Sequence, residues 1–473
     1  MAVAAVVALL GGAAHADTSR LSSLLAATPQ GGWIQASTSS WSNAWPTGST
    51  AVPEGAGSNV LAVAIAWSSF AWDSRRDSLL LWGGGHANYK GNEMYVWDAG
   101  TGAWSRGSLP SRLGANDFVV DNAAPQSAHT YDNNVYLPVN NMFLTFGGAA
   151  YNSGGNFRTD IGGVVERAGP WLWDPTKADG NKVGGTTGSG YDASTPGGNM
   201  WTNRAGSIVG TQGPSYVQGA TAYRTEIIGG KATDVVYVTS DSQASGLPGL
   251  YRYVASDVRN GGTDTMQQVG ADFSTGVYQG SATIDTTHNL YVRTAFNNVA
   301  GDPDFAVWDL TKSDATAPRN NREIPIRLAL ADGTAFKMSP NYGIDYDEAN
   351  GNMLLWDGAT GGQVWEVEAG YAADGSLLST WLVKALPRTT ATAPAGSFVS
   401  GVLGKWQYIS ELGAYMALDN YDFTARDASV WLYKPYSTAP VPELPVPVMM
   451  LAGLGLLMGV RRRRVRSTAQ PAL

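Results

Sequence analysis

Two histidines are the residues of this chain best suited to moving protons. The sequence has four histidines: His15 lies in the N-terminal apolar segment, His288 lies in the turn TTHN, and His86 and His129 remain. His86 follows three glycines in GGGHANYKGNEMY, and His129 lies in PQSAHTYD. Imidazole is the side chain used most often for general acid–base chemistry. We therefore predict His86 and His129 as the catalytic candidates, although a polar residue at the start of a strand can also be structural.

Tyrosine, arginine and amide side chains surround these histidines in the sequence. Tyr89 and Tyr151 are candidate acids that could work with the histidines. Arginine grips a carboxylate through two hydrogen bonds, while an aromatic ring stacks on a sugar ring. The predicted substrate-binding residues are Arg158, Arg204, Asn116, Asn156 and Trp201. The carboxylates Asp117, Asp160 and Asp241 leave glycoside hydrolysis by an acid pair open.

Several other chemistries lack the residues they need. The chain has no Cys, so it has no copper-radical site with a Cys joined to a Tyr, no C-x-x-C-H haem attachment and no disulfide. Neither an H-x-x-x-H pair nor an EF-hand loop is present, so we predict no metal site and no cofactor, with a divalent cation left open. Gly83 to Gly85 are not followed by G-K-[ST], and no G-x-S-x-G occurs.

The composition indicates a folded, strand-rich protein. The chain contains 58 Gly, 23 Pro, 17 Trp and 21 Tyr with 15% charged residues, which is typical of many short strands joined by turns. The formal charge is −8, and it becomes 26 − 39 = −13 without the five arginines near the C-terminus. Nucleic-acid binding needs a basic surface, so we predict no nucleic-acid partner.

A repeat of about sixty residues organises the chain. Each copy pairs an Asp-containing turn with an apolar strand, as in FAWDSRRDSLLLWGGG from Phe70 and GIDYDEANGNMLLWDG from Gly343. Copies aligned on Asp73, Asp132, Thr225, Asp285, Asp347 and Ser410 are separated by 59, 93, 60, 62 and 63 residues. A third strand follows each copy, and a fourth strand begins at Trp104, Trp201 and Trp381. Alternating apolar and polar positions predict strands for these segments.

Four strands per copy and six copies predict an all-β propeller over residues 31–435, with seven blades as the alternative. The sixth copy lacks a fourth strand, and Gly31 to Ser37 has the character to supply it. The Gly-Gly after the second strand and the Trp-Asp before the third resemble kelch repeats. A two-sheet sandwich followed by a second domain is the rival architecture, but it would not predict one period throughout.

The alternation of strand direction places both histidines on one end of such a propeller. His86 falls between the second and third strands of the first copy, and His129 at the first strand of the second copy. Loops in these two positions emerge on the same face, which we expect to be a loop-rich mouth. Further residues predicted there are Arg112, Asp117, Asp160, Tyr191 and Asn203.

The two ends of the chain indicate export. Residues 1–16 form a predicted signal peptide, with Ala14-His15-Ala16 before the cleavage point. Near the C-terminus stand Val441, Pro442 and Glu443, an apolar run over 446–460, and Arg461, Arg462, Arg463 and Arg464 followed by Arg466. The apolar run would span about 22 Å as a short transmembrane helix. This order over 441–466 resembles the PEP-CTERM sorting tail of Gram-negative bacteria, with Leu444 in place of the usual second Pro.

The resemblance implies an exosortase-type processing enzyme as a partner and a transient contact with the membrane. It also implies a final location at the cell surface or outside the cell. An ordinary C-terminal membrane anchor is the alternative for the tail. For function, we expect a protein that binds extracellular polysaccharide through its mouth. A polysaccharide lyase acting on a uronate-containing glycan and a protein-binding scaffold are the alternatives.

Overall fold

A computed structural model describes residues 18–114, 116–240, 249–271, 279–295, 302–338, 342–359, 361–396, 400–422 and 427–435. These residues belong to one compact unit that ends at Pro435. Strands dominate it, and its two α-helices are short: α1 (Ser19–Ala27) and α2 (Ala62–Ile65). No helix within the described ranges is long and apolar enough to cross a bilayer. The predicted signal peptide and the tail over 441–466, with its helix at 446–460, lie outside those ranges.

The strands form sets of four, each named here after its first strand. The β2 set contains β2 (Ser69–Asp73), β3 (Ser78–Trp82), β4 (Tyr95–Asp98) and β5 (Trp104–Arg106), paired antiparallel in chain order. The β7 set contains β7 (Asn134–Leu137), β8 (Met142–Thr145), β12 (Trp171–Trp173) and β13 (Trp201–Asn203). The β15 set contains β15 (Thr221–Ile228), β16 (Lys231–Thr239), β17 (Gly249–Ala255) and β18 (Asp264–Ala271), with β14 (Ile208–Gly210) added in parallel at its outer edge.

The next two sets share one eight-stranded sheet. The β19 set contains β19 (Ala282–Asp285), β20 (Leu290–Thr294), β21 (Phe305–Asp309) and β22 (Ile324–Ala329). The β23 set contains β23 (Gly343–Asp347), β24 (Asn352–Trp356), β25 (Val364–Val367) and β26 (Thr380–Ala385). Their outermost strands, β22 and β26, pair in parallel and join the two sets.

The last set combines both ends of the compact unit. It contains β27 (Trp406–Ile409), β28 (Ala414–Asp422) and β29 (Asp427–Lys434), and its fourth strand is β1 (Gly32–Gln35). Strand β1 pairs antiparallel with β29, Trp33 opposite Tyr433. Trp33 packs against Trp356, Trp406 and Tyr433, with ring centroids 5.0–5.6 Å apart. The N-terminal segment therefore supplies the strand that the sixth copy of the repeat lacks, as its sequence predicts.

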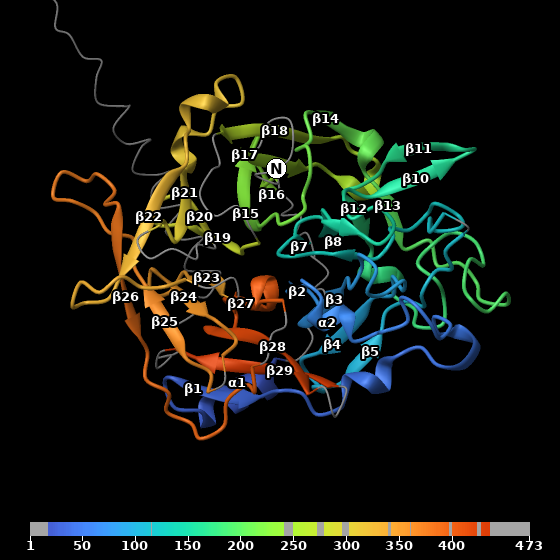
Figure 1. The fold of residues 1–473 in the computed structure, drawn as a ribbon, viewed down its shortest axis with the longest axis horizontal. Helices are drawn as coiled ribbons and strands as arrows, with labels where there is room; N and C mark the ends of the chain where they lie inside the picture. Colours follow the sequence, from blue (N-terminus) through green and yellow to red (C-terminus); the bar gives the residue numbers. More distant parts are fainter. Residues whose placement is uncertain are drawn as a thin grey trace, which may run out of the picture. The chain divides into compact units, whose positions relative to one another are not determined.

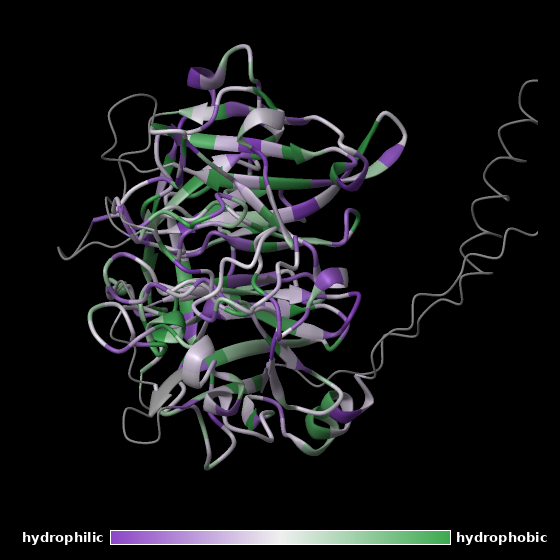
Figure 2. Cartoon of the chain, turned by 90° about the vertical axis from the view of Figure 1, so that its right-hand side faces the viewer, coloured by the Kyte–Doolittle hydropathy of each residue, from purple (hydrophilic) through white to green (hydrophobic). Residues whose placement is uncertain are grey.

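The first strands of the sets lie around a common centre (Figure 1). Strand β2 contacts β7, β7 contacts β15, and the contacts continue through β19 and β23 to β27, which a 3-10 helix, η8 (Leu403–Lys405), links back to β2. Hydrophobic stretches run along the strands (Figure 2) and form clusters between neighbouring sets. A ring of radially arranged antiparallel sheets with an apolar core between them is the architecture of a β-propeller.

Polar side chains on the first strands join neighbouring sets. The Asn134 amide donates to the carbonyl oxygens of Ser69 and Trp82, and Gln407 donates to that of Phe70. The carboxylate of Asp345 accepts hydrogen bonds from Thr283 Oγ1 and from the backbone N–H of Tyr408, both at 2.7 Å. Such bonds satisfy strand edges that would otherwise be unpaired at the centre of the ring.

The second copy of the repeat differs from the sequence-based alignment. Asp132 precedes the first strand, β7, whereas Asp73, Asp285 and Asp347 end theirs. His129 is likewise not part of that strand; it ends a separate two-residue strand, β6 (Ala128–His129), which pairs with β9 (Ala149–Ala150). The turn sequence around Asp132 resembles the repeat, but strand pairing places the real turn after Leu137.

Candidate functional site

His86 and His129 lie side by side although 43 positions separate them in the sequence. His86 is in the loop between β3 and β4, and β6 brings His129 next to that loop. Their ring centroids are 5.4 Å apart, and the rings meet edge to face at 71°. His86 is exposed, whereas His129 is only 3% exposed. The pair therefore joins one accessible imidazole to one buried imidazole.

Aromatic rings enclose His129. Its ring lies 4.6 Å from the ring of Trp67 and 6.2 Å from that of Tyr131. Burial, with a smaller contribution from His86, lowers the pKa of His129 to about 3. A charged imidazolium would lose its hydration in this position, so His129 is neutral at physiological pH.

Asn88 connects the two histidines. When its amide nitrogen faces the carbonyl oxygens of Gly85 and His86, 3.2 and 3.0 Å away, that nitrogen also donates to Nε2 of His129 at 2.7 Å. This orientation satisfies the amide on both sides and makes Nε2 an acceptor. The ring proton of neutral His129 then resides on Nδ1.

The backbone around the histidines adopts an unusual conformation. Trp67, His86, Ala87 and Tyr131 have positive φ angles of 44°, 50°, 63° and 51°. Bulky residues rarely occupy this left-handed region, and each such residue costs about 1–3 kcal/mol. A concentration of these conformations around one pair of rings is typical of functional sites, because the surrounding fold must hold them in place.

Gly154 packs against His86 on the exposed side of the site, and Tyr151 belongs to the same loop. A Cβ atom on Gly154 would lie 2.6 Å from Cε1 of His86, so only glycine leaves room for that ring. Tyr151 is half-buried, and the ammonium group of Lys90 lies 5.8 Å from the centre of its ring. The loop that follows β9 thus brings Gly154 against His86, and Tyr151 of the same loop lies beside Lys90 and Gly57.

Tyr89 and Trp201 have structural contacts instead. The hydroxyl of buried Tyr89 donates to Glu93 Oε1 at 2.6 Å, and burial raises the pKa of Tyr89. Trp201 is 4% exposed, and its ring packs against Trp82 at 5.4 Å. Neither side chain reaches the surface, so they support the β2 and β7 sets rather than the exposed site.

Two of the predicted binding residues, Arg204 and Asn156, are held by other groups of the protein. Arg204 is 3% exposed and forms an ion pair with Asp264, with Nε 2.8 Å from Oδ2. Burial alone would lower the pKa of Arg204, but the ion pair outweighs it and raises that pKa. Asn156 donates to the carbonyl of Pro214 at 2.7 Å. Arg158, at the start of the hairpin β10 (Arg158–Ile161) and β11 (Val164–Arg167), and Asn116 are exposed.

The carboxylates considered for glycoside hydrolysis form no described pair. Asp160 accepts a hydrogen bond from Gly163 N at 2.8 Å, and Asp117 lies in a turn with a φ angle of 57°. Asp241 lies outside the described residues. Within those residues, no three or more His, Cys, Asp or Glu side chains are arranged to hold one metal ion.

Sequence reasoning missed Trp67, Asn88, Tyr131 and Gly154. Asn88 and Tyr131 each stand two positions from a predicted histidine, so their place beside it had a local signal. Trp67 and Gly154 are brought in by tertiary packing, for which the repeat gave no indication.

Comparisons with known proteins give only remote likenesses. No family model and no curated protein matches the chain. Among solved structures, an α-L-arabinofuranosidase from Fusarium graminearum covers 78% of this chain and 93% of its own length, at 11% identity and a TM-score of 0.39. An α-L-arabinanase from Penicillium chrysogenum covers 76% and 90%, at 11% identity and 0.35. A leech intramolecular trans-sialidase covers 81% and 70%, at 11% identity and 0.33. Scores this low carry no weight for the fold, which rests on the strand pairing above.

Proposed function

We propose that this protein is an exported β-propeller that binds extracellular polysaccharide at the face formed by Trp67, His86, His129 and Tyr151. The observation that carries the proposal is the group of left-handed residues that holds an exposed imidazole against a buried neutral one. Aromatic faces with few fixed charges suit sugar rings, since stacking requires a flat apolar surface and the exposed His86 imidazole supplies hydrogen bonds. The strand sets also support six blades closed by β1. We propose in addition that the repeat they share is kelch-like.

The tail over 441–466 supports the proposed location. We propose that an exosortase-type enzyme recognises it as a PEP-CTERM sorting signal and that the propeller is released to the cell surface or beyond. The membrane would be a partner only until the tail is cleaved. A polysaccharide ligand outside the cell agrees with this location and with the acidic charge, which disfavours nucleic acid.

Affinity electrophoresis through gels that contain single polysaccharides tests binding. We expect an acidic or neutral exopolysaccharide to retard the full chain, and His86→Ala and Tyr151→Ala each to weaken binding about fivefold, because each removes about 1 kcal/mol of stacking or hydrogen bonding. His288→Gln is the matched control, because His288 is also exposed but lies beside Asp285 and Tyr371, away from the proposed face, with its ring centroid 4.7 Å from that of Tyr371. Unretarded migration with every polysaccharide would contradict the proposal.

A polysaccharide lyase is the second candidate, favoured by the neutral state of His129 beside His86. In this reaction an imidazole takes the proton beside the uronate carboxylate, the glycosidic C–O bond at the next carbon breaks, and a C=C bond forms between the two carbons. Tyr151 would return a proton to the leaving oxygen, since the hydroxyl of Tyr89 is bound to Glu93. Arg158 is the remaining candidate for the carboxylate clamp, because Arg204 is paired with Asp264.

Ultraviolet absorbance of the unsaturated uronate product distinguishes the two candidates. Incubation with uronate polymers should raise the absorbance if the protein is a lyase, and His86→Ala should abolish the rise. Retardation in gels without any rise would leave binding as the function. A protein-binding scaffold, the third alternative, would instead retain a partner protein and no polysaccharide.

A further inference from the structure

The hairpin of β10 and β11 carries two arginines that face each other. It projects from the rim of the ring (Figure 1), and its register places Arg158 directly opposite Arg167. The carbonyl oxygen of Arg158 accepts a hydrogen bond from Gln126 at 2.6 Å, so it points away from β11. Arg158 and Arg167 therefore form a non-hydrogen-bonded pair, in which opposing side chains approach most closely. The Cβ atoms of such a pair are about 4.5–5.5 Å apart.

Neither arginine has a carboxylate partner. No ion pair between described residues includes Arg158 or Arg167. Asp160, on the same face of the hairpin, accepts the backbone N–H of Gly163 at 2.8 Å. Glu166 lies on the opposite face, because successive residues of a strand point to alternate sides. Like charges directly opposite each other are destabilising, so an anion between the two guanidinium groups would stabilise the hairpin.

The guanidinium group of Arg167 is fixed in position. Its Nη2 donates to the carbonyl oxygen of Gly213 at 2.8 Å, and its Cζ lies 5.5 Å from the centre of the Tyr216 ring. The remaining N–H donors of Arg167 can bind an anion without a large loss of side-chain entropy, since the planar group is already ordered. Arg158 is exposed, so its side chain can close on the same anion from the opposite strand.

The arginine pair adjoins the histidine face. Gln126, which binds the backbone of Arg158, stands three positions before His129, and three residues span at most about 11 Å. The ammonium group of Lys90 lies 5.8 Å from the centre of the Tyr151 ring, and no ion pair between described residues includes Lys90. A polysaccharide on the histidine face is therefore flanked by cations that no carboxylate of the described residues neutralises.

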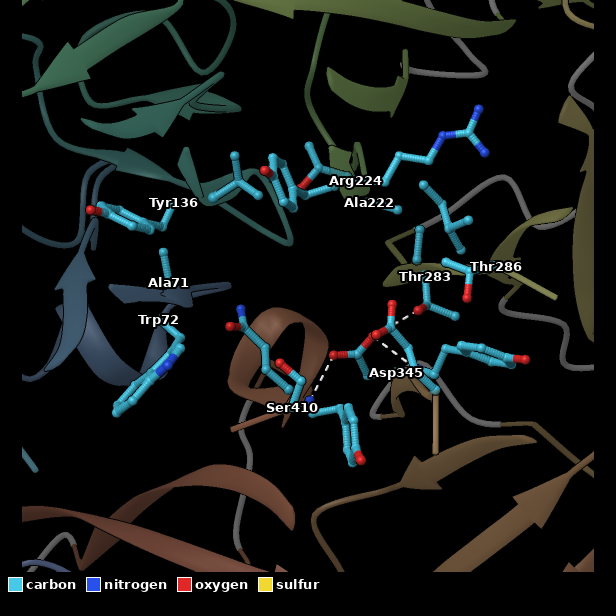
Figure 3. Close-up of a pocket in the computed structure, with 18 of the residues that line it drawn as sticks. Ala71, Trp72, Tyr136, Ala222, Arg224, Thr283, Thr286, Asp345 and Ser410 are labelled. Carbon is cyan, nitrogen blue, oxygen red and sulfur yellow. Dashed lines mark hydrogen bonds between the residues drawn. The ribbon is translucent and has the colours of Figure 1, made fainter. Parts of the chain in front are cut away.

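The cavity on the axis of the ring has the opposite charge. Its volume is about 790 Å³, and residues of all six first strands line it (Figure 3). Arg224 is the one arginine or lysine among the described residues that line it, and its Nη2 already pairs with Oε1 of Glu226 at 2.7 Å. The carboxyl groups of Asp345, Glu348 and Glu411 line the same cavity. An anionic ligand is therefore disfavoured on the axis, which leaves the hairpin as the place for one.

We propose that the polysaccharide bound by this protein is acidic, and that Arg158 and Arg167 together bind its carboxylate or sulfate groups. This inference rests on the proposed function and names the class of its ligand. Two guanidinium groups present paired N–H donors that match the oxygens of either anion. A neutral polysaccharide would leave the contact between the two like charges in place. Arg158 and Arg167 are thus specificity-determining residues, whereas the histidine face contacts the sugar rings.

Affinity electrophoresis with matched polymers tests this proposal. Polygalacturonate and its methyl-esterified form share a backbone, and dextran sulfate and dextran make the same comparison for sulfate groups. We expect the full chain to bind at least one acidic polymer about tenfold more tightly than its neutral counterpart, and salt to reduce the difference. Arg158→Gln and Arg167→Gln should each remove most of the difference. Arg319→Gln is the matched control, because Arg319 is an exposed arginine of the β19 set.

The outcomes separate this inference from the proposed function. Equal binding of acidic and neutral polymers, or a difference that both arginine variants retain, would overturn the role of the pair and leave polysaccharide binding in place. Retardation by none of the polymers would overturn both. Arg158→Gln should keep the melting temperature of the wild type, because the side chain is exposed and its replacement removes a contact between like charges. A loss of binding in this variant therefore does not come from unfolding.

Discussion

Protonation of His129 should make the free energy of unfolding depend on pH, and the substitution His129→Gln should remove this contribution. The folded-state pKa of about 3 lies below the unfolded value of about 6.5, so the unfolded chain binds the proton more readily. The stability contributed by neutral His129 is fully present above pH 6.5 and is lost as the pH falls from there toward 3. At pH 5 the unfolded imidazole is almost fully protonated, which lowers the free energy of unfolding by about 2 kcal/mol relative to pH 8.

The comparison of wild type with His129→Gln isolates this contribution. Urea unfolding at pH 8 and pH 5 gives the free energies, and groups common to both proteins cancel in the difference. We expect the wild type to lose about 2 kcal/mol more than the variant between the two pH values. Equal losses in both proteins would refute the reasoning, because they would mean that His129 is protonated in the folded state or solvated.

The closing strand, the buried ion pair and the glycine beside His86 give three further predictions. Trp33→Ala should lower the free energy of unfolding by about 3–5 kcal/mol in urea unfolding, because it removes a fully buried ring from the closure. Arg204→Ala should lower the free energy of unfolding by about 3–5 kcal/mol, because it leaves the buried carboxylate of Asp264 without its ion pair. Retardation by polysaccharide at low temperature, where the variant is folded, should stay unchanged. Weaker retardation of the folded variant would mean that Arg204 does bind the ligand. Gly154→Ala should displace the His86 ring and weaken retardation in gels, and it should also lower the melting temperature, because Gly154 has a φ of 64° that alanine adopts only with strain. Unchanged retardation of the folded variant would show that this contact is not needed.

The strands could be predicted from the sequence because their pattern is local and repeated. The segments at Met94, Trp171, Phe305 and Gln363 contain or adjoin the third strands of their sets, and Trp201 begins a fourth strand. Buried and more exposed positions alternate in β4, β22 and β26 because of the pleat, whereas β3, β20 and β24 are buried along their whole length and read as short apolar runs. The pairing of β22 with β26 is not predictable in this way, because it joins the outer edges of two sets and leaves no periodic signal.

The site was less accessible to sequence reasoning, for a different physical reason. His86 and His129 could be placed on one face from strand alternation alone, and the structure brings their rings together. Whether an arginine or a tyrosine is available to a ligand depends on its nearest buried partner, which is Asp264 for Arg204 and Glu93 for Tyr89. Asp264 lies 60 positions from Arg204, so the sequence around the arginine could not show it. Glu93 lies only four positions from Tyr89, but the burial that fixes their hydrogen bond is set by tertiary packing.

The pairing of β1 with β29 has a mechanical consequence. Strand β29 has hydrogen-bonded neighbours on both sides, β28 and β1, and it is the last strand before Pro435. A pulling force that enters from the C-terminal side along the strand would have to shear two ladders at once instead of peeling one open. The strand that closes the ring thus also gives β29 two hydrogen-bonded ladders that resist tension applied at the C-terminal end of the domain.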